Sequence, residues 1–157
     1  MGKPLDLHER ALRLLSVRPR SRRELERRLV RAGFEPTEVR EELERLEAVG
    51  LVDDRAFAQQ VLEHELAVRG SGRRAIVSRL AAKGVDRATI ESTLADLPAE
   101  ADEDRAGELA LGRLPRLAGL PREQAYARLT GFLARRGYDA DVARRAARRA
   151  LEVGSEP

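Results

Sequence analysis

Cysteine and tryptophan are both absent from this chain of 157 residues, and only 3% of its residues are aromatic. Without cysteine, neither a disulfide nor a thiolate metal site can form. No apolar run approaches the roughly 18 residues of a membrane-spanning helix, and the charged segment from Met1 to Arg10 lacks the apolar stretch of a signal peptide. We therefore expect a cytoplasmic protein with a thin core of aliphatic side chains and no contact with a membrane.

Motifs of catalysis are also scarce. The two histidines, His8 and His64, stand alone in charged segments, and neither has the H-x-x-x-H or H-E-x-x-H spacing that would bind zinc. The run Gly70, Ser71 and Gly72 matches neither G-x-x-x-x-G-K-[ST] nor G-x-G-x-x-G, so it predicts a turn between two helices and not a phosphate loop. We expect no enzymatic activity, no metal and no cofactor.

One pair of adjacent carboxylates, Asp53 and Asp54, could in principle hold a divalent cation. The pair lies between Gly50, which is placed to end one helix, and an apolar run that includes Phe57 and belongs to the next. A helix needs hydrogen-bond acceptors at its N-terminus, where a side-chain cap contributes about 0.5–2 kcal/mol. We therefore interpret Asp53 as the cap of the helix that runs through Phe57.

A short pattern occurs three times: two aliphatic residues four apart, a glycine four residues later, and an apolar residue directly after the glycine. Aliphatic residues at this spacing line one face of a helix, and the glycine can adopt the left-handed conformation that ends it. A period of about 50 residues is typical of helical repeats, which stack their apolar faces on one another. The copies are Leu25, Leu29, Gly33 and Phe34, then Ile76, Leu80, Gly84 and Val85, then Leu129, Leu133, Gly137 and Tyr138.

An acidic residue lies two positions after each of these glycines: Glu35, Asp86 and Asp139. We expect a helix to begin at each acid, because a carboxylate can accept hydrogen bonds from exposed helix amides and suits the positive end of the helix dipole. Ser21 and Glu24, three residues apart, predict a capping box for an earlier helix. Each repeat then holds two helices joined by a glycine corner.

Room for a third helix precedes each pair, and no segment shows the sustained alternation of apolar and polar residues that a half-buried strand would show. The sequence thus predicts an all-α fold of three tandem three-helix repeats in an elongated array. We place these repeats at residues 1–52, 53–98 and 99–153, with a short tail at 154–157. The acidic stretch from Leu97 to Asp104 is interpreted as a link between the second and third repeats.

The net charge of +3 conceals a segregation of sign. Residues 18–31 contain seven arginines and two acids, whereas residues 35–47 contain six acids and two arginines. Near the C-terminus, arginines spaced i, i+1, i+4 and i+5 share one face of a helix: Arg144, Arg145, Arg148 and Arg149. Such a stripe can bind phosphates or an acidic protein surface. The alternative is a solvated helix face in a chain whose 30 basic residues include 28 arginines.

The chain resembles the RecX family of bacterial regulatory proteins in four segments: Ser21–Leu29, Gly50–Ala58, Gly72–Gly84 and Leu133–Tyr138. The resemblance extends over residues 8–152, and its most specific element is the stretch Leu-Val-Asp-Asp-x-x-Phe-Ala. It implies a curved array of three three-helix units that binds the recombinase RecA, chiefly when RecA is polymerised on single-stranded DNA. It also implies inhibition of RecA filament growth, of its ATPase activity and of its stimulation of repressor self-cleavage, and hence a role in homologous recombination, DNA repair and the SOS response.

Charge and resemblance together select the candidate binding residues. These are Arg22, Arg23, Arg27, Arg73, Arg74, Lys83, Arg135, Arg136, Arg144, Arg145, Arg148 and Arg149. We expect them to contact the RecA filament, with single-stranded DNA bound directly or through RecA, and we expect the protein to be a monomer. A structural motif is expected at Asp53, Asp54, Phe57, Gly33, Gly84 and Gly137.

Two other functions remain open at this point. A free-standing DNA-binding protein would use its helix pairs as helix-turn-helix units. The helices after the glycine corners, however, open with Glu35, Asp86 and Asp139, and these acids would repel phosphate where a recognition helix begins. The third possibility is a helical scaffold that binds no nucleic acid.

Overall fold

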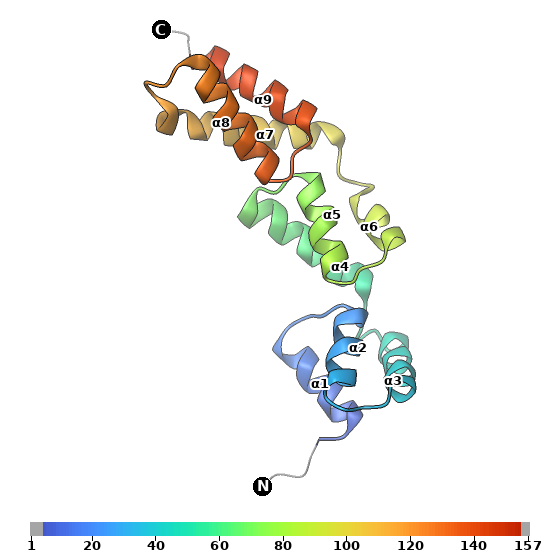
Figure 1. Cartoon of the computed structure of the whole chain (residues 1–157). Coiled ribbons are helices and arrows are strands. Elements are labelled where there is room, and N and C mark those ends of the chain that lie inside the picture. Colours follow the sequence, from blue (N-terminus) through green and yellow to red (C-terminus); the bar gives the residue numbers. More distant parts are fainter. Residues whose placement is uncertain (1–4, 155–157) are drawn as a thin grey trace. The chain divides into compact units, whose positions relative to one another are not determined.

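The computed structural model describes residues 5–154, and this part of the chain is helical throughout (Figure 1). It contains nine α-helices, one π-helix and one 3-10 helix, and it has no strand. The all-α fold of three-helix repeats is confirmed. The elements are α1 (Leu7–Val17), α2 (Arg22–Arg31), α3 (Pro36–Ala48), α4 (Asp54–His64), the π-helix η1 (Glu65–Arg69), α5 (Arg73–Ala82), α6 (Arg87–Leu94), α7 (Ala99–Arg113), the 3-10 helix η2 (Leu114–Leu117), α8 (Arg122–Arg135) and α9 (Ala140–Val153).

The described chain packs as two compact units. The first unit extends to Val61 and includes Leu80–Thr93, and the second holds Leu62–Arg79 and the residues from Leu94 onward. These limits fall within α4 and α5 and not between repeats, so the repeat limits at residues 52, 98 and 153 stay predictions. The predicted tail at 154–157 lies outside the described residues except for Gly154.

Each unit has its own aliphatic core. In the first unit, α1, α2 and α3 bury Ala11, Leu25, Leu29, Val39, Leu43, Leu46 and Val52. In the second unit, α9 contributes four small buried residues, Ala143, Ala146, Ala147 and Ala150, which pack with Leu129 and Leu133 of α8 and Ala106 and Ala110 of α7. Burial of a leucine side chain stabilises a fold by about 1.5–3 kcal/mol, so the predicted leucine pairs anchor both cores.

The glycines of the three corners have positive φ, as predicted: +100° at Gly33, +85° at Gly84 and +89° at Gly137. The expected acid caps are only partly present. Asp86 accepts hydrogen bonds from the backbone N–H and the hydroxyl of Thr89, each across 2.9 Å. Glu35 and Asp139 make no side-chain cap hydrogen bond, so that expectation is wrong for both.

The predicted capping box at Ser21 is also half formed. The Ser21 hydroxyl accepts the N–H of Glu24 across 3.1 Å, but the Glu24 carboxylate turns to neighbouring arginines. A complete capping box opens α1, where Asp6 accepts the N–H of Glu9 across 2.8 Å and Glu9 accepts the N–H of Asp6 across 3.2 Å. Glu24 does not close its box because three guanidinium groups compete for its carboxylate.

In the first unit the second glycine corner packs against the start of α2. The Ser21 hydroxyl, at the N-cap of α2, donates to the backbone carbonyl of Lys83. A Cβ built on Gly84 would lie 2.7 Å from the Cβ of Arg23, inside the range in which atoms overlap. Gly84 is therefore required for space as well as for its positive φ.

The second unit repeats this arrangement at the third corner. The backbone N–H of Arg74, near the start of α5, donates to the carbonyl of Gly137 across 3.1 Å. A Cβ built on Gly137 would lie 2.2 Å from the Cβ of Ala75. Gly33, in the first corner, has open space around it instead, so only its φ requires glycine.

The adjacent acids Asp53 and Asp54 serve two different helices. One oxygen of Asp53 accepts the backbone N–H groups of Arg55 and Ala56, each across 3.0 Å, which confirms the predicted cap of α4. Asp54 reaches the start of α2, where it accepts the N–H of Arg22 across 2.8 Å. Both carboxylates therefore bind helix N-termini, an arrangement that favours the capping interpretation over a cation site.

The acidic stretch interpreted as a link is mostly helix, which corrects that expectation. α7 begins at Ala99, so most of the acids fall in its first turns, where negative charge suits the helix dipole. Buried Asp102 accepts the N–H of Arg73, at the start of α5, across 3.1 Å and pairs with Arg105. The stretch thus fixes one helix of the second unit to another.

The turn predicted at Gly70, Ser71 and Gly72 is confirmed, but the buried acid before it was not predicted. Glu65, in the π-helix, is 2% exposed and accepts the Ser71 hydroxyl across 2.7 Å. Its carboxylate also pairs with Arg79 at 3.1 Å and with Arg69 at 3.5 Å. This charge is buried with partners, which a buried carboxylate requires.

Candidate functional site

The candidate residues on α2 divide into bound and free side chains. Arg22 pairs with Glu47, and the stem of Arg23 packs at the Gly84 corner. Arg27 is exposed and has no ion-pair partner within residues 5–154. Of these three, Arg27 is the one whose guanidinium is available to another molecule.

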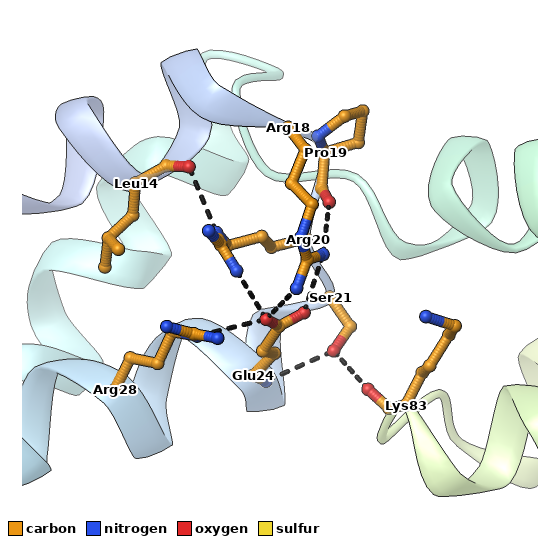
Figure 2. Close-up of polar contacts among 8 residues, drawn as sticks. All are labelled: Leu14, Arg18, Pro19, Arg20, Ser21, Glu24, Arg28 and Lys83. Carbon is orange, nitrogen blue, oxygen red and sulfur yellow. Dashed lines mark hydrogen bonds and ion pairs between the residues drawn. The ribbon is translucent and has the colours of Figure 1, made fainter.

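Beside them lies a cluster that the sequence did not reveal, centred on Glu24 (Figure 2). Its Oε1 accepts Arg18 and Arg20, each across 2.5 Å, and Arg28 across 3.1 Å. The Arg20 side chain is buried and also donates to the carbonyl of Leu14 across 3.0 Å. Burial acts to raise the pKa of Glu24, but the hydrogen bonds from Arg18 and Arg20 outweigh it and hold the pKa below its ordinary value. The cluster fastens the loop between α1 and α2, and so accounts for three arginines of this basic segment structurally.

On α5 the two candidates differ in the same way. Arg73 donates through its guanidinium to the carbonyls of Leu94 and Leu97, where α6 ends, so its charge serves the fold. Arg74 is 69% exposed, and its Nε lies 3.8 Å from an oxygen of Asp139, an acid that is itself 62% exposed. An exposed pair at this distance is weak, so Arg74 is readily available to a partner.

Lys83 stands at the second glycine corner. Its Nζ lies 6.0 Å from the centre of the Phe57 ring, at the outer limit of a cation–π contact. Its carbonyl accepts the Ser21 hydroxyl, as described above. The predicted structural residue Phe57 is 6% exposed and belongs to the core.

The four arginines of α9 lie opposite its buried alanines and are all exposed. Arg144 pairs with Asp141 and Arg145 with Glu103 of α7, each across 2.5 Å. Arg148 and Arg149 have no acidic partner in the part of the chain that the structure describes. The predicted stripe is therefore half neutralised, and its C-terminal half carries unpaired charge.

The last two candidates follow the end of α8. Arg136 donates to the carbonyl of Arg69, and its Cζ lies 5.2 Å from the centre of the Phe132 ring. Arg135 is exposed and has no acid beside it among residues 5–154. Arg136 is thus held in the fold, whereas Arg135 is free.

Sites of other kinds were also sought in the described residues. No group of three or more histidine, cysteine, aspartate or glutamate side chains is placed to hold a metal ion there. None of the helices in residues 5–154 combines the length and apolar character needed to cross a membrane.

Three-helix units, repeated in tandem and rich in exposed arginine, define an all-helical repeat protein with basic surfaces. Three family models match the chain in order: the first three-helix domain of RecX at residues 8–46, the second at 53–94 and the third at 100–147. The chain belongs to the RecX family. The resemblance noted in the sequence is confirmed.

Relatives and solved structures agree with this assignment. The regulatory protein RecX of Streptomyces coelicolor is 40% identical over 145 residues, which are 92% of this chain and 77% of that protein. The regulatory protein RecX of Mycobacterium sp. strain KMS is 43% identical over 140 residues, 87% of this chain and 76% of that protein. The crystal structure of RecX from Lactobacillus salivarius shares the fold, with a TM-score of 0.84, 19% identity, and coverage of 92% of this chain and 94% of that one.

Proposed function

We propose that this protein is a cytoplasmic, monomeric regulator that binds the RecA filament on single-stranded DNA and lowers its recombinase, ATPase and coprotease activities. The observation that carries the proposal is the ordered match of all three RecX domains along the chain. The relatives named above are regulatory proteins, which supports a regulatory and not a catalytic role. Inhibition and the identity of the partner follow from the family resemblance.

The free arginines support an anionic partner. Arg27, Arg135, Arg148 and Arg149 are exposed and lack acidic partners within the described residues. Arginine binds phosphate and carboxylate groups through two parallel hydrogen bonds, and release of counterions from DNA adds to the affinity. We propose that these side chains make the principal contacts, while the paired candidates Arg22, Arg73 and Arg136 mainly hold the fold.

A gel-shift experiment tests the proposal against both alternatives. A labelled single-stranded oligonucleotide is titrated with the protein alone, and then after assembly with RecA and a slowly hydrolysed ATP analogue. The proposal predicts a further shift of the RecA complex at protein concentrations that leave the naked strand unshifted. Tight binding of naked DNA with no added effect of RecA would support the helix-turn-helix alternative instead. Binding to neither would leave only a scaffold role.

The acids at the glycine corners speak against that DNA-binding alternative. Asp86 and Asp139 are exposed at the N-caps of α6 and α9, and Glu35 is at the N-cap of α3. A recognition helix enters the major groove with its N-terminal residues close to the bases and phosphates. Carboxylates at these positions would be repelled by the DNA backbone.

A further inference from the structure

A cavity in the second unit is lined by four arginines and by no acidic residue. Its volume is about 480 Å³, and its walls come from the end of α7, from η2 and from one face of α8. None of the four arginines has an acidic partner among residues 5–154. We call this site the arginine pocket, and its charged residues are Arg113, Arg116, Arg128 and Arg135.

An aromatic ring holds one of these guanidinium groups in place. The Cζ of Arg113 lies 4.7 Å from the centre of the Phe132 ring, within the range of a cation–π interaction. Phe132 itself lines the pocket and packs against the core of the second unit. Arg113 therefore loses less conformational freedom on binding an anion than a fully mobile side chain would.

Gly131 lines the pocket between two of the arginines. Arg128, Gly131 and Arg135 are spaced i, i+3 and i+7 on α8, so they share one helical face. Glycine is a poor helix former, and a Cβ at this position would meet only Nη1 of Arg135, at 3.2 Å. Core packing therefore does not require glycine here. Its effect is to leave space beside the Arg135 guanidinium.

Helix dipoles explain only part of the arrangement. Positive side chains are favoured in the last turn of a helix, where Arg113 and Arg135 lie, but Arg128 is in the middle of α8. Four like charges around one cavity repel one another in the free protein. A bound anion of high charge density would relieve that repulsion.

We propose that the arginine pocket binds a compact polyphosphate group, of the kind carried by nucleoside di- and triphosphates. The volume falls within the range of about 300–1,000 Å³ that is typical of small-molecule sites. A nucleic-acid strand spreads one charge per phosphate along an extended line, whereas a triphosphate concentrates several charges in one small volume. Four guanidinium groups around one concavity match the second distribution. The pocket would serve as an effector site, independent of the filament-binding role.

Calorimetry and thermal unfolding of the full chain with inorganic triphosphate test the proposal. We expect saturable binding of one triphosphate per chain and a higher melting temperature, because a ligand that binds only the folded state stabilises it. The exposed-residue variants Arg116→Gln and Arg128→Gln should each weaken binding about tenfold, as expected for loss of a charged hydrogen bond. Arg149→Gln removes the same charge outside the pocket, and it should change the affinity less than about twofold.

A fourth variant separates binding from stability. Gly131→Ala should keep or raise the melting temperature of the free protein, because alanine is the better helix former, yet it should weaken triphosphate binding. ATP should compete with inorganic triphosphate for the site, and orthophosphate should bind far more weakly. The proposal is overturned by the absence of saturable binding, by an equal loss of affinity in Arg149→Gln, by failure of ATP to compete, or by unchanged affinity in Gly131→Ala.

Discussion

The carboxylate of Asp54 accepts the backbone N–H of Arg22 across 2.8 Å, and Asp102 accepts the N–H of Arg73 in the same way across 3.1 Å. In both cases the donor is the first residue of a repeat's middle helix, and the acid belongs to the opening helix of the following repeat. The first N–H groups of a helix have no intrahelical acceptor, so each contact satisfies a donor that would otherwise be unpaired. Repeats that follow one another in sequence are thereby fastened by the same bond within each compact unit.

Asp54 should therefore matter as an acceptor and not as a charge. Asp54→Ala removes the acceptor and should lower the free energy of unfolding by about 0.5–2 kcal/mol. Burial raises the pKa of Asp54 above its ordinary 3.8, although the Arg22 N–H partly offsets this. The folded protein thus binds the proton more tightly, and stability from this group falls as pH rises from 3.8 through the raised value. Asp54→Asn keeps an oxygen acceptor without the charge, so at pH 7 it should be at least as stable as wild type in urea unfolding.

The glycine corners should differ in their tolerance of alanine. All three have positive φ, which disfavours a β-carbon by about 1 kcal/mol. Gly84→Ala and Gly137→Ala add a steric overlap with Arg23 and Ala75, costing roughly a further 1–3 kcal/mol, whereas Gly33→Ala adds none. Thermal unfolding should rank Gly33→Ala as the mildest change. Equal effects at all three sites would show that the corner contacts contribute nothing.

The Glu24 cluster should give stability a measurable dependence on pH. Because the folded pKa of Glu24 lies below its ordinary 4.5, its contribution is complete above that value and is lost as pH falls through the lowered one. Glu24→Gln should therefore destabilise the protein at pH 7 by about 1–2 kcal/mol and much less near pH 3. Glu26→Gln on the same helix is the control, since Glu26 has no ion-pair partner in the described chain. A pH-independent difference for Glu24→Gln would contradict the role assigned to the cluster.

The unpaired half of the α9 stripe should affect filament binding through phosphate contacts. Replacing Arg148 and Arg149 by glutamine should weaken binding to RecA on single-stranded DNA and flatten its salt dependence by about 0.7 per lost phosphate contact. Arg10→Gln with Arg13→Gln provides the matched control, because both arginines are exposed on α1 and remove the same charge. Binding that falls equally in the two double variants would mean that only net charge matters. An unchanged salt slope would point to an acidic protein surface as the partner.

The fold could be read from the sequence because its signals are local. The leucine spacing and the glycine of each corner lie within ten residues of each other, and the Asp53 cap needs only its own helix. The failures involve distant partners. Nothing near Glu24 in sequence shows that three arginines would outcompete its capping bond, and Asp139 faces Arg74 instead of its own helix.

The candidate surface was harder to predict for the same reason. Charge counts cannot separate Arg73, whose guanidinium binds the end of α6, from Arg74, which is exposed beside it. The arginine pocket also escaped notice, because Arg113 and Arg116 are near Arg128 only once α7, η2 and α8 have packed. Ion pairing and convergence are tertiary properties. Of its four arginines, the sequence selected only Arg135.

The most direct test of the proposed function is the rate of ATP hydrolysis by RecA on single-stranded DNA, measured with rising amounts of the protein at less than one molecule per RecA. The proposal predicts a steep fall in rate at these low ratios, because a few regulators on a filament would restrain many RecA subunits. The variant with glutamate at Arg144, Arg145, Arg148 and Arg149 should remain folded and should lose this effect. A rate that stays unchanged with wild-type protein up to equimolar amounts would contradict the account.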